Sequence, residues 1–158
     1  MRLAFLLYGL LVTLGVIAGF KRIICEMGIM ARLASAVLLS ISPLGVLWDG
    51  IFTMEAPAMH TLGAVIAFST PIIAFPIVGI LLRRVPSWRR FGVWMLLGCP
   101  LTLALLIGFM RSVPPSEMAS GGGNLGLWQR ALLLEVQAWY VAYGWLAFRA
   151  LKKMDSAY

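Results

Sequence analysis

Residues 3–20 read LAFLLYGLLVTLGVIAGF, a stretch of 18 residues without a charged side chain. A helix that crosses a bilayer needs about 20 predominantly apolar residues. The stretch exceeds the apolar core of about 7–15 residues that is typical of secretion signals. Lys21 and Arg22 follow it directly, with no small-residue cleavage site before them. We therefore expect residues 3–20 to form a retained transmembrane helix.

Composition extends this interpretation to the whole chain. Of its 158 residues, 61% are hydrophobic and 12% are charged. Soluble domains contain roughly 45–50% apolar and about 25% charged residues. The sequence is therefore neither a water-soluble globule nor a disordered chain, and its length suits a single domain.

Four further apolar runs are each long enough to span a membrane. They cover residues 29–48, 59–82, 91–110 and 127–151. The fold predicted for residues 1–158 is all-α, a single integral membrane domain built as a bundle of five transmembrane helices. Within the third run, Pro71 and Pro76 each remove a backbone donor and predict kinks. Ser69 and Thr70 are close enough in sequence to satisfy the freed carbonyls.

The basic residues predict an orientation for this bundle. If the N-terminus is outside, ten of the 13 Lys and Arg residues fall in cytoplasmic segments, and only Arg2, Arg111 and Arg130 fall outside. The positive-inside rule therefore predicts an outer N-terminus and a cytoplasmic C-terminus. The net charge of +7 has the same origin, because the charges lie between apolar runs. We expect no nucleic-acid partner.

With this topology, most of the unusual polar residues lie in the outer half of the membrane. The candidate ligand-binding residues are Asp49, His60, Arg111, Gln129, Arg130 and Glu135. If they converge, we expect a cavity among them, lined by Trp128 and Phe52. Asp49 to His60 is interpreted as a short polar connection, in which the carboxylate could orient the imidazole. A simple polar contact at a helix end is the alternative for His60.

Glu135 lies about 12 Å into the fifth run at 1.5 Å per residue, where an ionised carboxylate is costly. Arg130 or Arg111 is the expected partner. Such a pair could simply hold the fifth helix to the bundle, or it could belong to a ligand site.

Several chemistries are excluded or disfavoured. One histidine cannot form a bis-histidine haem site, and Cys25, Cys99 and His60 are predicted at different depths, too far apart for zinc. We expect both cysteines to be free thiols. The chain has no G-x-S-x-G elbow and no G-x-x-x-x-G-K-[ST] motif, and the glycines at residues 121–123 are interpreted as a flexible linker. We therefore expect no metal and no cofactor.

Short motifs near the candidate residues resemble a known family. They are DGIF at residues 49–52, HTLGA at 60–64, LLRR at 81–84 and GLWQR at 126–130. The chain resembles the DUF998 family of small bacterial and archaeal membrane proteins and, more loosely, is similar to the Frag1/DRAM/Sfk1 membrane proteins. The resemblance implies a helical bundle in a bacterial or archaeal cytoplasmic membrane, with no established activity.

The resemblance also bears on particular positions. Asp49, His60, Gln129 and Arg130 match the family's polar motifs. The family usually has six spans, so five spans here imply that its first helix and first outer loop are missing.

Three functions remain open at this stage. The first is binding of a lipid headgroup or another small polar ligand by the outer residues, with the arginines on phosphate and Asp49 and Glu55 on an amine. The second is an accessory role in a larger membrane complex or homo-oligomer, with Gly15/Gly19 and Gly63/Ala67 packing against a partner. The third is a lipid-modifying enzyme that uses His60 and Asp49 as an acid–base pair. We favour a non-enzymatic role.

Overall fold

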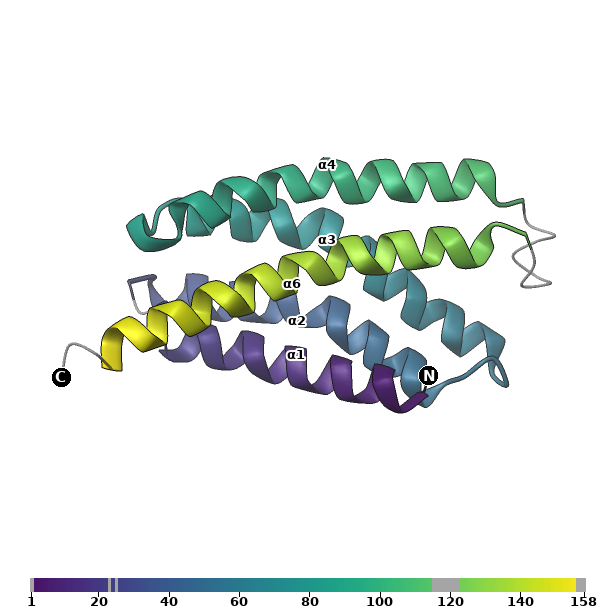
Figure 1. The fold of residues 1–158 in the computed structure, drawn as a ribbon, viewed down its shortest axis with the longest axis horizontal. Coiled ribbons are helices and arrows are strands. Elements are labelled where there is room, and N and C mark those ends of the chain that lie inside the picture. Colours follow the sequence, from purple (N-terminus) through teal and green to yellow (C-terminus); the bar gives the residue numbers. More distant parts are fainter. Residues whose placement is uncertain (1, 23, 25, 115–122, 156–158) are drawn as a thin grey trace.

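The structure is a computed structural model, which describes residues 2–22, 24, 26–114 and 123–155. Cys25 lies outside these residues. Five long helices make up nearly all of the described chain (Figure 1). They are α1 (Arg2–Arg22), α2 (Ile29–Ile51), α3 (Pro57–Leu82), α4 (Arg89–Ser112) and α6 (Leu125–Asp155), with a short 3₁₀ turn, η1 (Pro86–Trp88), before α4.

The five helices run alternately up and down (Figure 1), so that α1 begins at one end of the bundle and α6 finishes at the other. All five are long and apolar enough to cross a membrane. No strand occurs within the described ranges. The prediction of an all-α bundle of five spans is confirmed.

Helices α1 to α4 each pack against the next in the chain, and α6 lies across them in contact with α4, α1 and α3 (Figure 1). The core lies beneath α6, where Val136 and Tyr143 meet Phe20, Phe75 and Met95. Large apolar side chains also cover the outside of the bundle. In a membrane this surface faces lipid, so its exposure carries no penalty.

Helices α2 and α3 approach closely because both carry small residues at the crossing. A Cβ atom added to Gly45 would lie 2.7 Å from the Ala67 nitrogen and 2.8 Å from the Gly63 carbonyl oxygen. Small residues at membrane helix crossings allow backbones to pack in this way. Gly63 and Ala67 therefore pack inside the chain, and the expectation that they pack against a partner protein is wrong.

A proline within α2 creates a hydrogen bond to α6. Proline has no N–H, so Pro43 leaves the carbonyl of Leu39, four residues earlier, without its helical donor. The Tyr140 hydroxyl of α6 donates to this carbonyl at 2.7 Å, in a buried position. The missing intrahelical bond becomes a bond between two helices.

At Pro71 in α3, a hydrogen bond between helices again replaces the missing intrahelical one. The freed carbonyl belongs to Ala67, and the Ser42 hydroxyl of α2 donates to it at 2.7 Å. The sequence predicts Ser69 and Thr70 for this role, but both hydroxyls donate to carbonyls one turn earlier, which are not the freed ones. The donor comes from the neighbouring helix because Ser42 is buried against α3.

Pro76 provides a third example. It frees the carbonyl of Ile72, and the Cys99 thiol of α4 lies 3.2 Å from that oxygen as donor. Cys99 is a free cysteine, as expected. Side chains of α2, α4 and α6 thus complete the backbone of their neighbours at three prolines.

Candidate functional site

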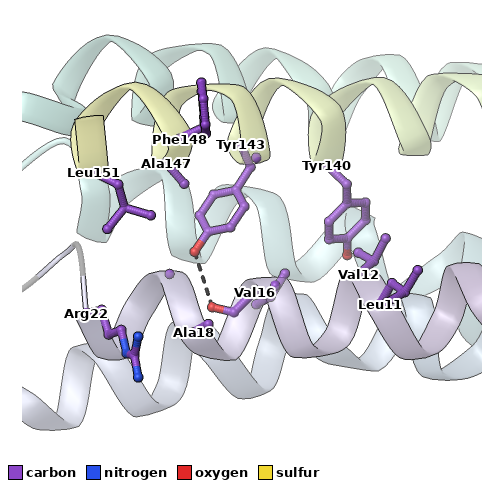
Figure 2. Close-up of a pocket in the computed structure, with 13 residues that line it drawn as sticks. Leu11, Val12, Val16, Ala18, Arg22, Tyr140, Tyr143, Ala147, Phe148 and Leu151 are labelled. Atoms are coloured by element: carbon purple, nitrogen blue, oxygen red, sulfur yellow. Dashed lines mark hydrogen bonds between the residues drawn. The ribbon is translucent and has the colours of Figure 1, made fainter. Parts of the chain in front are cut away.

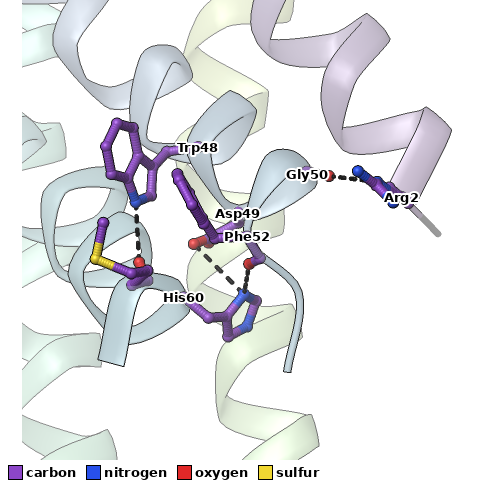
Figure 3. Close-up of polar contacts among 7 residues, drawn as sticks. Arg2, Trp48, Asp49, Gly50, Phe52 and His60 are labelled. Atoms are coloured by element: carbon purple, nitrogen blue, oxygen red, sulfur yellow. Dashed lines mark hydrogen bonds and ion pairs between the residues drawn. The ribbon is translucent and has the colours of Figure 1, made fainter. Parts of the chain in front are cut away.

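Asp49 and His60 lie together where α2 ends and α3 begins (Figure 3). Asp49 occupies the last turn of α2, so the polar connection is shorter than expected and comprises only residues 52–56. His60 lies in the first turn of α3. Its Nδ1 atom is 3.6 Å from Asp49 Oδ1, and the side chains are 24% and 10% exposed, respectively.

The imidazole is anchored through its Nδ1 atom. This atom lies 3.1 Å from the carbonyl oxygen of Phe52 (Figure 3). Because a carbonyl can only accept, Nδ1 must carry the hydrogen, and in the neutral ring Nε2 then holds the lone pair. Nδ1 donates its hydrogen to the Phe52 carbonyl, so the neighbouring Asp49 carboxylate has no close donor.

Asp49 Oδ1 is the chemically unusual atom of this pair. It is buried, and no donor among the described residues lies within hydrogen-bond distance of it. Buried polar atoms in native proteins are nearly always paired. A carboxylate oxygen in this position needs a donor that the described residues do not supply.

The surroundings hold Asp49 in place. The Trp48 indole donates to the Met59 carbonyl at 3.0 Å, and its ring lies 4.6 Å from that of Phe52. Gly63 is required beside the carboxylate, because a Cβ there would collide with Asp49 Oδ1. The Asp49 carboxylate is thus fixed between two helix ends.

A cation that is not among the predicted site residues binds the end of α2. Arg2, at the start of α1, donates from Nε to the Gly50 carbonyl at 3.2 Å, one residue from Asp49 (Figure 3). A guanidinium has five N–H donors. The position of Arg2 could not be found from the sequence, because it depends on how α1 packs beside the end of α2.

The other predicted residues of this end are arranged differently. Arg111 ends α4, and Gln129 and Arg130 lie in the first turns of α6, at the same end of the bundle as His60 (Figure 1). All three are exposed. Within the described chain, no hydrogen bond or ion pair links them to Asp49 or His60.

Phe52 and Trp128, which are expected to line a common cavity, pack on different helices. Phe52 packs on Trp48, whereas Trp128 covers Gly108 of α4, where an added Cβ would lie 2.5 Å from the indole. A groove between α1 and α6 and a hollow at the end of α3 lie elsewhere, and neither includes any of the six candidate residues.

Glu135 has neutral partners. Thr102 Oγ1 of α4 lies 2.9 and 3.1 Å from its two carboxyl oxygens, and the Trp139 indole donates to Oε1 at 2.6 Å. Among the described residues no ion pair joins Glu135 to an arginine. The expectation of an Arg130 or Arg111 partner is wrong.

The helical repeat explains this correction. Arg130 precedes Glu135 by five residues, which places the two about 140° apart around a helix of 3.6 residues per turn. Trp139 follows by four residues and therefore lies on the same face. This spacing was visible in the sequence, but Thr102 could be found only from the register of α4 against α6.

No group of three His, Cys, Asp or Glu side chains comes together within the described residues.

Comparison with known proteins identifies the family of the chain. No curated protein and no solved structure matches the chain significantly. These comparisons do not show the looser similarity to the Frag1/DRAM/Sfk1 proteins. Over residues 1–146, however, the chain matches the family described as "Protein of unknown function (DUF998)". With five apolar helices that are long enough to span a membrane, the chain is an integral membrane protein that belongs to the DUF998 family.

Proposed function

We propose that this membrane protein binds the headgroup of an amine-bearing phospholipid at the Asp49–His60 end of the bundle. The observation that carries the proposal is Asp49 Oδ1, a buried carboxylate oxygen without a donor from the described chain. A primary ammonium group supplies N–H donors and a compensating positive charge. Both properties match this oxygen, because a buried charge is stable only when it is paired and hydrogen-bonded.

The phosphate of the same headgroup has a partner nearby. Arg2 donates to the Gly50 carbonyl, at the same end of the bundle as Asp49. Guanidinium groups suit phosphate because their planar fork can bond two oxygens at once. Arg111 and Arg130 are exposed at the same end of the bundle and add positive charge there. A zwitterionic phosphoethanolamine group would thus meet opposite charges from α2 and α1.

The charge distribution supports one side of the membrane for this site. By the positive-inside rule, this end of the bundle would lie on the outer side of a bacterial or archaeal cytoplasmic membrane. The lipid would then come from the outer leaflet.

The test uses the full chain in mild detergent with an equimolar mixture of phosphatidylethanolamine and phosphatidylcholine. Choline carries three methyl groups in place of N–H donors, so it cannot hydrogen-bond to Asp49. Native mass spectrometry should show wild-type protein retaining the ethanolamine lipid in preference.

Asp49→Asn should abolish this preference, because the neutral amide no longer attracts the ammonium. Glu26→Gln is the matched control, since Glu26 is an exposed carboxylate between α1 and α2 at the opposite end of the bundle, and it should leave the preference unchanged. An Asp49→Asn protein with the wild-type lipid ratio would contradict the proposal.

A second candidate rests on the tautomer of His60. With hydrogen on Nδ1, the Nε2 lone pair is available as a general base, and the nearby carboxylate would stabilise the charged ring. Nε2 would take a proton from water, which would attack the headgroup phosphorus and break the bond to the glycerol oxygen, so that phosphoethanolamine is released and diacylglycerol remains. Incubation with isotopically labelled phosphatidylethanolamine distinguishes the two functions. An enzyme releases labelled headgroup in wild type and not in His60→Gln, whereas a binding protein returns the lipid intact.

A further inference from the structure

A groove between α1 and α6 opens on the side of the bundle (Figure 2). Its volume is about 490 Å³, within the range of ligand sites in proteins. It is lined by residues 11–22 of α1 and residues 140–151 of α6. The groove lies toward the end of the bundle opposite Asp49 and His60, so it is independent of the function proposed above (Figure 1).

The groove wall is apolar, although two tyrosines contribute to it. The Tyr143 hydroxyl donates to the Val16 carbonyl at 3.2 Å, and the Tyr140 hydroxyl donates to the Leu39 carbonyl. Both hydroxyls are thus used by the protein, and their rings face the groove (Figure 2). Because both hydroxyls are bonded within the protein, the wall of the groove is apolar and suits a hydrocarbon chain.

Small residues create the space. Gly15 of α1 and Gly144 of α6 both line the groove, and a Cβ added to either would meet no described heavy atom within 4 Å. Gly19 differs, because a Cβ there would collide with the Tyr143 hydroxyl. The two helices therefore touch at Gly19 and are separated at Gly15 and Gly144.

The basic end of the groove indicates its occupant. Arg22 lines the groove at its end (Figure 2). Lys21, Arg149, Lys152 and Lys153 lie in the same end of the bundle, on the last turns of α1 and α6. Clusters of basic residues at a membrane surface attract anionic lipid headgroups.

The length of the groove along the helices distinguishes between two possible occupants, a lipid chain and a transmembrane helix of a partner protein. Residues 11 to 22 span about 17 Å at 1.5 Å per residue. The hydrocarbon core of a bilayer is about 30 Å thick, so one leaflet provides about 15 Å. The groove thus matches one leaflet, whereas a transmembrane helix of a partner would need a groove through both.

We propose that the α1–α6 groove binds one acyl chain of an anionic phospholipid, with the headgroup phosphate at the basic end beside Arg22. The lipid belongs to the leaflet on the side where α1 ends and α6 ends. It would fill the space that the two helices leave between them.

The experiment fills the groove from within. Gly144→Leu and Gly15→Leu place a side chain in the open space, where its Cβ meets no described heavy atom within 4 Å. Gly126→Leu is the control, because Gly126 has equally open surroundings but does not line the groove. The full chain is purified in mild detergent with equimolar phosphatidylglycerol and phosphatidylcholine, and native mass spectrometry counts the lipids retained.

Wild type and Gly126→Leu should retain one phosphatidylglycerol in preference, and both groove variants should lose it. Arg22→Gln should lower the preference for the anionic lipid about fivefold, the effect of one basic residue at an anionic surface. Asp49→Asn, which removes the proposed amine site, should leave phosphatidylglycerol retention at the wild-type level, and this result separates the two sites. Equal phosphatidylglycerol retention in Gly144→Leu and Gly126→Leu would overturn the proposal. So would a dimer that only the groove variants lose, since it would make a second copy the occupant.

Discussion

Replacing Tyr140 by Phe should destabilise the bundle only while Pro43 is present. The Tyr140 hydroxyl donates to the Leu39 carbonyl at 2.7 Å. That carbonyl needs an external donor because Pro43, four residues later, has no N–H. In a Pro43→Ala background, the N–H of residue 43 can donate to Leu39 along the helix, and the tyrosine hydroxyl becomes dispensable.

The expected magnitude follows from the burial of this bond. Hydrogen bonds inside membrane proteins contribute about 0.6 kcal/mol on average and at most about 1.7. A buried acceptor left without a partner costs about 1–3 kcal/mol. Tyr140→Phe leaves such an acceptor, because Leu39 is buried. We expect a loss of about 1–2 kcal/mol in the wild-type background and close to zero with Pro43→Ala.

The assay is equilibrium unfolding of four proteins in mixed micelles, analysed as a double-mutant cycle. Pro43→Ala also removes buried ring carbons, at about 0.8 kcal/mol for each CH₂. The cycle subtracts this packing loss, because it is common to both proteins that carry the change.

Tyr143→Phe provides the matched control. Its hydroxyl donates to the Val16 carbonyl at 3.2 Å, but residue 20 is Phe20, so the backbone donor four residues later is present. Its cost should therefore be the same with and without Pro43→Ala. If Tyr140→Phe behaved in the same additive way, the compensation of the proline by the tyrosine would be refuted.

Three further outcomes are expected. Thr102→Val and Glu135→Ala should each cost about 1–2 kcal/mol in the same unfolding assay, because neither change leaves a buried cation behind. Breaking a buried ion pair costs about 3–5 kcal/mol, so a loss in that range would indicate a charged partner. Gly45→Ala should cost about 1–3 kcal/mol because its Cβ meets backbone atoms of α3, whereas Gly126→Ala should change stability by less than about 0.5 kcal/mol, and equal effects would contradict the close crossing. A reporter active only in the cytoplasm should give signal when fused to Tyr158, and its silence there, with signal from a reporter active only outside, would reverse the orientation.

Much of the fold could be predicted from the sequence, because the length and apolarity of the five runs determine spanning helices. The ends of the helices were less predictable. Asp49 is polar and Gly50 is a poor helix former, yet α2 continues to Ile51. Intrahelical hydrogen bonds and packing against α1 outweigh the weak preference of these two residues for a turn. Asp49 thereby lies on a helix and not in a loop.

The candidate site could be predicted only where it is local in the chain. Asp49 and His60 meet because a short connection joins two antiparallel helices. Arg2 and Thr102 could not be found in this way. Their positions depend on how α1 packs on α2 and how α4 packs on α6, and apolar periodicity does not determine these registers.

The bond between Tyr140 and Leu39 also has a consequence for biogenesis. A membrane protein is synthesised from its N-terminus, so α2 enters the bilayer long before α6 exists. Until the last helix arrives, the carbonyl freed by Pro43 lacks its donor in a medium that offers no water. Fragments that end before α6 should therefore be recognised by quality-control proteases as unfinished, even though each of their helices is apolar enough to insert. Arrival of the fifth span completes a backbone that was laid down 101 residues earlier.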